Sequence, residues 1–421
     1  MTKRLAIAAC VASAMAGAGR ARADFVYELS PNVGAGASDD IYVVAEGQQN
    51  KIRDGFTLVG GTGRLRYTGA RSTHTLAYTV SYLRYVQGLY PDTLSNNLSW
   101  LSSLNLSALL TLRLGAGATL TRSSGLDAAN PAQAVAESSL AGSALFSLIT
   151  ANQALTYEPS PRWHLGETVT AGYLRYLDTT MPGTSLSAMP RTTYLSLALE
   201  GERLVGREGY GVQADVTDTY TSIAGMPVAN SRTFGHTLLA RLLAGWRHEF
   251  SPFWSTRLQA GPSVIYRLDG AGVAAPAGVA TVNYTRLPWF ASLVAGQTLA
   301  ANPYLGDAIL ADQVTLRLAL PVDRIERVFV GAFGSYSYAR IADAQGHFQR
   351  AYDQLVGGAS LNWVFPRARA AASLSYTVTS QRGATLPGYT TLDLGRQYVF
   401  LNVRSDLAWG PGTPPLFGGA M

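Results

Sequence analysis

The sequence predicts an all-β fold: a closed antiparallel transmembrane β-barrel of about 18 strands, with about 16 as the lower bound, preceded by a cleaved signal peptide. Three observations support this prediction. The chain opens like a secreted protein, its composition is poor in charge but rich in glycine and tyrosine, and apolar residues recur at every second position across many segments.

The first residues have the layout of a secretory signal. Lys3 and Arg4 are followed by a short apolar stretch, residues 5–19, and by the small residues of 21–23 just before Asp24. The apolar stretch is shorter than the roughly 20 residues that a membrane-spanning helix needs. The expected organisation is therefore a signal peptide at 1–23, a barrel at 24–409 and a short Pro/Gly-rich periplasmic tail at 410–421.

Composition narrows the functional classes. Charged residues make up 14% of the chain, which also contains 43 glycines and 22 tyrosines. Removing the four basic residues of the signal from the total of 33 leaves 29 against 27 acidic residues, a net charge of +2. The mature chain therefore lacks the excess of positive charge that is typical of nucleic-acid-binding proteins. Cys10 is the only cysteine, so the mature chain has no disulfide and no thiolate metal site.

Alternation is the main evidence for membrane-spanning strands. From Tyr210 to Thr217, Tyr, Val and Ala alternate with Gly, Gln, Asp and Thr. One face would meet lipid and the other water. A soluble sandwich would carry more charge on its outer face. The predicted spans are 25–37, 54–69, 72–86, 95–106, 110–122, 143–157, 162–177, 191–204, 210–222, 234–249, 254–267, 277–287, 289–299, 309–321, 326–341, 352–365, 368–381 and 396–409.

Connection lengths and aromatic residues indicate the orientation. Short turns follow the even-numbered strands and longer polar loops, such as 123–142, follow the odd-numbered ones, as expected for periplasmic turns and outer loops. An even number of strands leaves both termini in the periplasm. Tryptophans gather beside the predicted short turns and form an expected periplasmic aromatic girdle of Trp163, Trp246, Trp254, Trp289, Trp363 and Trp409.

Successive residues of a strand point alternately to lipid and to the lumen, and we say that the lumen-facing set has inward parity and the other set outward parity. The residues with inward parity are the candidates for function, because a barrel of this size encloses water. Two interpretations remain open: a mixed-charge pore lining that hydrogen-bonds a hydrated solute, or cross-strand pairs that brace the wall, which we favour. The candidates are Arg113, Arg241, Arg247, Arg257, Arg317 and Arg404, with Glu200, Glu202, Asp215, Glu249 and Asp406.

Other polar residues suggest lipid contact rather than catalysis. Arg84, Arg122, Arg175 and Arg340 have outward parity near the extracellular ends, where they could hold phosphates of outer-membrane lipid and lipopolysaccharide, although parity drift explains them equally well. The five histidines are scattered, and the chain has no metalloprotease or nucleophile-elbow pattern. We expect no enzyme, cofactor or metal.

One region resembles a known family. The segment from Tyr27 to Asp40, the segment from Leu65 to Tyr78 and the step Asn96-Asn97-Leu98 are similar to the β-barrel porin 2 group. That group includes the polysaccharide porins of exosortase-associated and myxobacterial export systems. The resemblance covers mainly residues 25–110, and the chain departs from the group in Asp39-Asp40, where an Asp-Asn step is common, and in its Pro/Gly-rich end.

The resemblance implies an outer-membrane conduit for exopolysaccharide that works with a periplasmic polysaccharide export protein. The polysaccharide would then be the transported ligand. No catalytic residue is carried over, because the group is not enzymatic. A general diffusion porin for small hydrophilic solutes is the alternative, and a barrel enzyme or adhesin is a third hypothesis. All three place the mature protein in the outer membrane of a Gram-negative bacterium.

Overall fold

The computed structural model describes residues 24–39, 53–87, 92–122, 144–179, 190–223, 235–267, 272–286, 288–301, 308–322, 327–342, 346–383, 385–386, 389–390 and 394–409. The signal peptide expected at 1–23 and the tail expected at 410–421 lie outside these residues. In the described part of the chain, no helix combines the length and the apolar character needed to cross a membrane.

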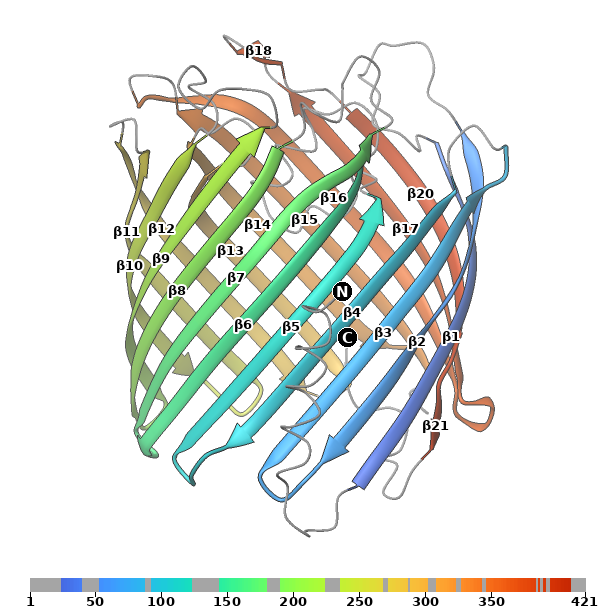
Figure 1. Cartoon of the computed structure of the whole chain (residues 1–421), viewed down its shortest axis with the longest axis horizontal. Coiled ribbons are helices and arrows are strands. Elements are labelled where there is room, and N and C mark those ends of the chain that lie inside the picture. The colour runs from blue at the N-terminus through green and yellow to red at the C-terminus, as the bar shows by residue number, and fades with distance from the viewer. Residues whose placement is uncertain are drawn as a thin grey trace, which may run out of the picture.

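Within these ranges the chain forms one closed antiparallel barrel of eighteen strands (Figure 1), as predicted. The last strand consists of two pieces, β20 and β21, separated at Asp406. The strands are β1 (Asp24–Ser38), β2 (Asp54–Thr68), β3 (Ser72–Tyr85), β4 (Thr93–Asn105), β5 (Leu110–Arg122), β6 (Ala144–Ser160), β7 (Trp163–Thr179), β8 (Pro190–Val205), β9 (Glu208–Ile223), β10 (His236–Glu249), β11 (Trp254–Arg267), β12 (Gly272–Arg286), β13 (Trp289–Ala301), β14 (Ala308–Pro321), β15 (Val328–Ala342), β16 (Phe348–Phe365), β17 (Ala370–Gly383), β20 (Leu394–Ser405) and β21 (Leu407–Trp409).

Closure occurs between the first and last strands. β1 pairs with β2 on one side and with β20 and β21 on the other, where Val33 lies opposite Val403 and Tyr27 opposite Trp409. Every other barrel strand pairs with its neighbours in sequence. Closure gives the first and last strands a partner on both sides, so neither exposes an unpaired edge to lipid.

Most predicted strand boundaries agree with the structure to within two residues. The main differences are that β12 begins five residues earlier than predicted and β16 four residues earlier, so 348–351 belongs to a strand rather than to a loop. A two-stranded hairpin of β18 (Thr385–Leu386) and β19 (Tyr389–Thr390) lies within the predicted loop 382–395. The connections between β6 and β7 and between β8 and β9 have only two residues each, which identifies this end of the barrel as periplasmic.

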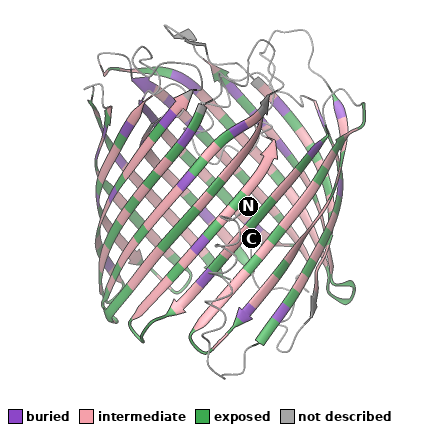
Figure 2. Ribbon diagram, viewed as in Figure 1, coloured by how far each residue is buried: buried purple, intermediate pink, exposed green. Residues whose placement is uncertain are grey.

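The outer wall is apolar. Along β8, Leu195, Leu197 and Leu199 are exposed, and Val212 and Val216 continue the same face on β9. Exposed residues recur along the strands around the barrel (Figure 2). In water such a surface would be a severe aggregation liability, whereas in a bilayer it contacts hydrocarbon. The protein is therefore an outer-membrane barrel.

Two glycines on β1 make room for aromatic rings inside the barrel. A Cβ on Gly34 would lie 2.5 Å from Cζ of Phe400, and one on Gly36 would lie 2.5 Å from Cζ of Phe56. The two rings stack with their centroids 5.7 Å apart. The Gly-Ala-Gly sequence of β1 therefore serves packing within the wall.

The extracellular ends of β13, β14 and β15 turn into the barrel. Leu299 and Leu310 share parity with the lipid-facing residues of their strands, yet they are 2% and 4% exposed. They pack in one apolar cluster with Ile265 and Ala275, which have inward parity on β11 and β12. The pairing between β12 and β13 stops at Gly278 and Gln297, below this cluster. We call these ends of β13–β15 the inturned edge.

The inturned edge is also covered on its other face. Ile309, Ala311, Ala339 and Ile341 have inward parity and pack with Tyr352 of β16, all at 2% exposure or less. Both faces of this part of the sheet are thus buried in protein. In the rest of the wall one face is exposed to lipid and the other to the lumen. The inturned edge therefore narrows the extracellular mouth.

Candidate functional site: the lumen wall

The inner face of the barrel is polar and accessible to solvent. Along the inward rows, the side chains of Glu158, Glu200 and Arg404 are 61%, 45% and 55% exposed. An inward carboxylate or guanidinium that keeps this much exposure is hydrated, because burial without a partner would be costly. The lumen therefore contains water, as expected for a barrel of eighteen strands.

Several of the predicted inward charges pair across strands. Asp215 accepts hydrogen bonds from Nε of Arg241 at 2.5 Å and from Nε2 of Gln213 at 2.7 Å. Nε of Arg247 lies 3.7 Å from Oε1 of Glu202, and its Nη2 lies 3.6 Å from Oε1 of Glu249. The contacts of Arg241 with Asp215 and of Arg247 with Glu202 run between strands, as bracing of the wall requires, whereas Arg247 and Glu249 lie on the same strand, β10.

Near the strand junction, Arg404 reaches Asp406. Its Nη2 lies 3.3 Å from Oδ2 of Asp406, the residue that separates β20 from β21. Three other predicted arginines have side chains with no hydrogen bond or ion pair to any residue in the described part of the chain: Arg113, Arg257 and Arg317. Their charge is directed at the lumen, where it can meet solutes or counterions.

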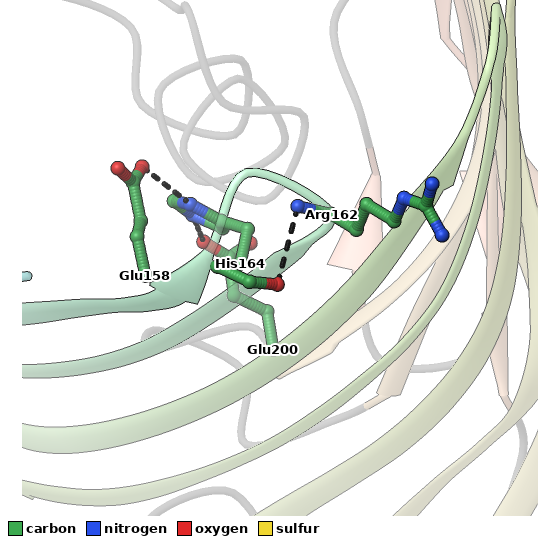
Figure 3. Close-up of polar contacts among 5 residues, drawn as sticks. Glu158, Arg162, His164 and Glu200 are labelled. Atoms are coloured by element: carbon green, nitrogen blue, oxygen red, sulfur yellow. Dashed lines mark hydrogen bonds and ion pairs between the residues drawn. The ribbon is translucent and has the colours of Figure 1, made fainter.

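A histidine that the sequence analysis left unassigned sits between two glutamates (Figure 3). Nδ1 of His164 lies 3.2 Å from Oε1 of Glu158, and Nε2 lies 3.3 Å from Oε1 of Glu200. The three residues belong to the consecutive strands β6, β7 and β8. Strand alternation alone places these side chains on the inner face. Glu158 follows the exposed, lipid-facing Tyr157, and His164 lies between the exposed Trp163 and Leu165.

A cavity of about 400 Å³ opens in the lumen wall beside this cluster, close to the periplasmic end. Its floor contains Gly211 of β9 and Gly245 of β10, which lie opposite each other in the ladder. Because neither residue carries a side chain, the floor is recessed between the glutamates of β8 and the arginines of β10 and β11. We call this feature the wall pocket.

The tryptophans of the predicted girdle lie at the periplasmic end of their strands. Trp163, Trp254 and Trp289 are the first residues of β7, β11 and β13, and each is exposed. Trp246 donates from Nε1 to Oε2 of Glu208 at 2.6 Å. Trp363 pairs with Val328 and Ala372 near the end of β16, and the backbone of Trp409 pairs with Tyr27.

The outward arginines have unequal surroundings. Nη2 of Arg340 lies 2.7 Å from Oδ2 of Asp312, and Gln297 donates to the other oxygen of the same carboxylate. Arg84 lies opposite Thr57, and Arg175 opposite Ser147 and Arg191. Arg340 also lies opposite Leu310 in the inturned edge, on the face of the sheet that turns toward β11 and β12.

Within the described ranges, no group of three or more His, Cys, Asp or Glu side chains is arranged to hold a metal ion. What the geometry does define is a class: a closed outer-membrane β-barrel with a hydrated, charged lumen, which is a barrel channel.

No family model and no curated protein matches the sequence. Among solved structures, the chain is similar to OccAB3 of Acinetobacter baumannii, with 10% identity, a TM-score of 0.44 and coverage of 92% of this chain and 100% of that one. It is similar to OpdK of Pseudomonas aeruginosa, determined with vanillate, with 11% identity, a TM-score of 0.45 and coverage of 92% and 99%. A third is the apoprotein of the FrpB iron transporter of Neisseria meningitidis, with 10% identity, a TM-score of 0.48 and coverage of 91% and 81%.

Proposed function

We propose that the protein is a passive channel for small hydrophilic solutes across the outer membrane. The observation that carries this proposal is the combination of a hydrated, charged lumen with an inturned edge that narrows the mouth. A lumen of this kind lets a solute exchange its water for wall hydrogen bonds. A narrowed mouth favours the passage of small solutes over that of polysaccharide chains.

The channel would work in a wall of lipid and lipopolysaccharide. The apolar outer rows contact hydrocarbon, and the girdle of Trp163, Trp254 and Trp289 would lie at the periplasmic headgroup level. No partner protein is required for diffusion down a gradient. No cofactor enters the proposal.

The test is reconstitution of the purified mature protein in planar bilayers. We expect single-channel steps in KCl with a linear current–voltage relation. Liposomes carrying the protein should admit monosaccharides quickly and trisaccharides slowly, because the inturned edge limits the size of what passes. Tight liposomes and silent bilayers, with the protein shown to be folded, would contradict the proposal.

Polysaccharide export is the second candidate, and its support is the resemblance of residues 25–110 to the β-barrel porin 2 group. In this case the protein would be silent alone and would conduct only with a periplasmic export protein present. A deletion strain would then lack surface exopolysaccharide. A deletion strain with normal surface polysaccharide, together with conductance by the protein alone, would decide for the solute channel.

A further inference from the structure

The wall pocket is lined by side chains of both charges. On one side are the carboxylates of Glu158 and Glu200, which share the imidazole of His164 as their side-chain contact. On the other side is Arg257, opposite Arg247 in the β10–β11 ladder. Two like charges facing each other across a ladder are unfavourable unless an anionic group lies near both.

The pocket already holds one such carboxylate, but it does not serve both arginines. Glu202 lies 3.7 Å from Nε of Arg247, too far for a good hydrogen bond, and that Nε is buried without a hydrogen-bond partner. Arg257 is exposed and has no side-chain partner among the residues that the structure describes. Nη2 of Arg247 lies 3.6 Å from Glu249, so the donors of Arg257 are the ones on the basic side that remain both unsatisfied and open to the pocket.

The glycine floor leaves open space between β8, which carries Glu200, and β11, which carries Arg257. The row of residues across the wall runs from His164 through Glu202, Gly211 and Gly245 to Gln259, with neighbouring strands about 4.8 Å apart. In this row the two floor glycines leave a gap of about two strands between Glu202 and Gln259. At one rim of the gap Nε of Arg247 lies 3.7 Å from Oε1 of Glu202. A cavity of about 400 Å³ in this gap can take a solute of a few heavy atoms together with water.

Glycines also set the glutamates against the wall. A Cβ on Gly166 would lie 2.6 Å from Oε1 of Glu200, and one on Gly209 would collide with Oε1 of Glu202. Glu200 therefore lies over a glycine of β7, on the side away from the arginines, whereas Glu202 lies over Gly209 beside Arg247. This arrangement leaves the space above Gly211 and Gly245 free for a ligand.

From this geometry we infer that the wall pocket binds zwitterionic solutes of amino-acid size, with the ammonium group toward Glu158 and Glu200 and the carboxylate toward Arg247 and Arg257. Guanidinium groups bind a carboxylate through paired N–H donors, and glutamates accept from an ammonium group. A solute with both charges satisfies both sides at once, whereas an anion or a cation satisfies one. The inference deepens the proposed solute channel and rests on it.

The experiment uses four probes of similar size on single channels of the whole mature protein. The probes are L-alanine, lactate, 2-aminopropan-1-ol and propane-1,2-diol, which are respectively zwitterionic, anionic, cationic and neutral. We expect alanine to reduce the open-channel current saturably. Each of the other three should need about tenfold more for the same effect, because it lacks at least one charge-assisted set of hydrogen bonds.

Charge-neutral variants assign the two sides. Glu200→Gln should weaken the effect of alanine and of the amine but not that of lactate, and Arg257→Gln should weaken alanine and lactate but not the amine. Matched controls outside the wall pocket are Glu28→Gln and Arg66→Gln, on inward-facing positions of β1 and β2. Neither control should alter the alanine titration.

The outcomes separate the inference from the proposed function. Conductance in KCl with no saturable effect of alanine would overturn the zwitterion site and leave the solute channel standing. Equal loss in Glu200→Gln and Glu28→Gln would also overturn it, because a general change of lumen charge would then explain the effect. Absence of any conductance from the folded protein would overturn both.

Discussion

Arg241 and Asp215 lie directly opposite each other in the β9–β10 ladder, and Nε of Arg241 donates to Oδ2 of Asp215 at 2.5 Å. The carboxylate is 9% exposed, and Gln213 donates to its other oxygen. It is therefore the most enclosed carboxylate among the lumen ion pairs described above. Because water stabilises its negative charge less than it does for the exposed carboxylates, the charge of Asp215 depends more strongly on its arginine partner.

Replacing Arg241 with leucine should destabilise the barrel by about 2 kcal/mol, because the buried carboxylate of Asp215 loses its counter-charge and keeps only Gln213. The free energy of unfolding is measured by urea titration in lipid vesicles, followed by tryptophan fluorescence. The controls are the single variant Asp215→Asn and the double variant Asp215→Asn, Arg241→Leu. The double variant should recover most of the loss, and an additive loss in it would show that the two residues do not interact.

The β1 glycines give a second prediction. Gly36→Ala should cost about 1–3 kcal/mol, because the new methyl group would lie 2.5 Å from both the Phe56 ring and the carbonyl oxygen of Val399. The carbonyl belongs to the ladder and cannot move aside. The loss should appear as a lower urea midpoint with an unchanged slope.

Gly63 is the matched control for Gly36, since no atom lies within 4 Å of where its Cβ would be. Gly63→Ala on β2 should leave stability unchanged to within about 0.5 kcal/mol. If both alanine variants behaved alike, the loss would reflect glycine flexibility rather than packing against Phe56.

The strand pattern could be predicted because a membrane barrel repeats one physical rule, apolar outward and polar or small inward, along every strand. The early start of β12 was missed because Ala274, Ala275, Pro276 and Ala277 carry no polar–apolar contrast. The early start of β16 was missed because the register shifts between Ala339 and Arg340, which breaks the period of two.

The wall pocket and the inturned edge could not be predicted from the sequence, because both depend on how the strands are placed relative to one another. His164 meets Glu158 and Glu200 only after three strands are placed in register. Leu310 and Leu299 have ordinary lipid-facing parity, so their burial against Ile265 depends on a bend of the sheet across the mouth. Parity gives the face of a residue but not the path of the sheet.

The lipid-facing row of β8 gives a third prediction. Leu197→Arg near the middle of the strand should cost about 2–4 kcal/mol, because the guanidinium would be placed in hydrocarbon. The adjacent Ser196 has inward parity and accepts a hydrogen bond from Thr217 at 2.9 Å. Ser196→Arg should cost at most about 1 kcal/mol, since the arginine reaches water and only that bond is lost. Equal losses in urea titrations would contradict the assignment of the two faces.

The inturned edge gives the last prediction, which concerns conductance. Leu310 is 4% exposed and packs with Ile265 across the mouth. Leu310→Glu would bury an unpaired carboxylate at a cost of several kcal/mol, more than the roughly 2 kcal/mol that burial of the leucine side chain contributes.

The edge should then detach from the inner face of β11 and β12, while the rest of the ladder keeps the barrel closed. We expect a larger single-channel conductance and faster entry of trisaccharides into liposomes. Leu310→Ile keeps the apolar volume and should conduct like the unmodified protein. A Leu310→Glu barrel that is folded but has unchanged conductance would mean that the edge does not limit the pore, and the narrowest part of the path would then have to lie at another level of the lumen.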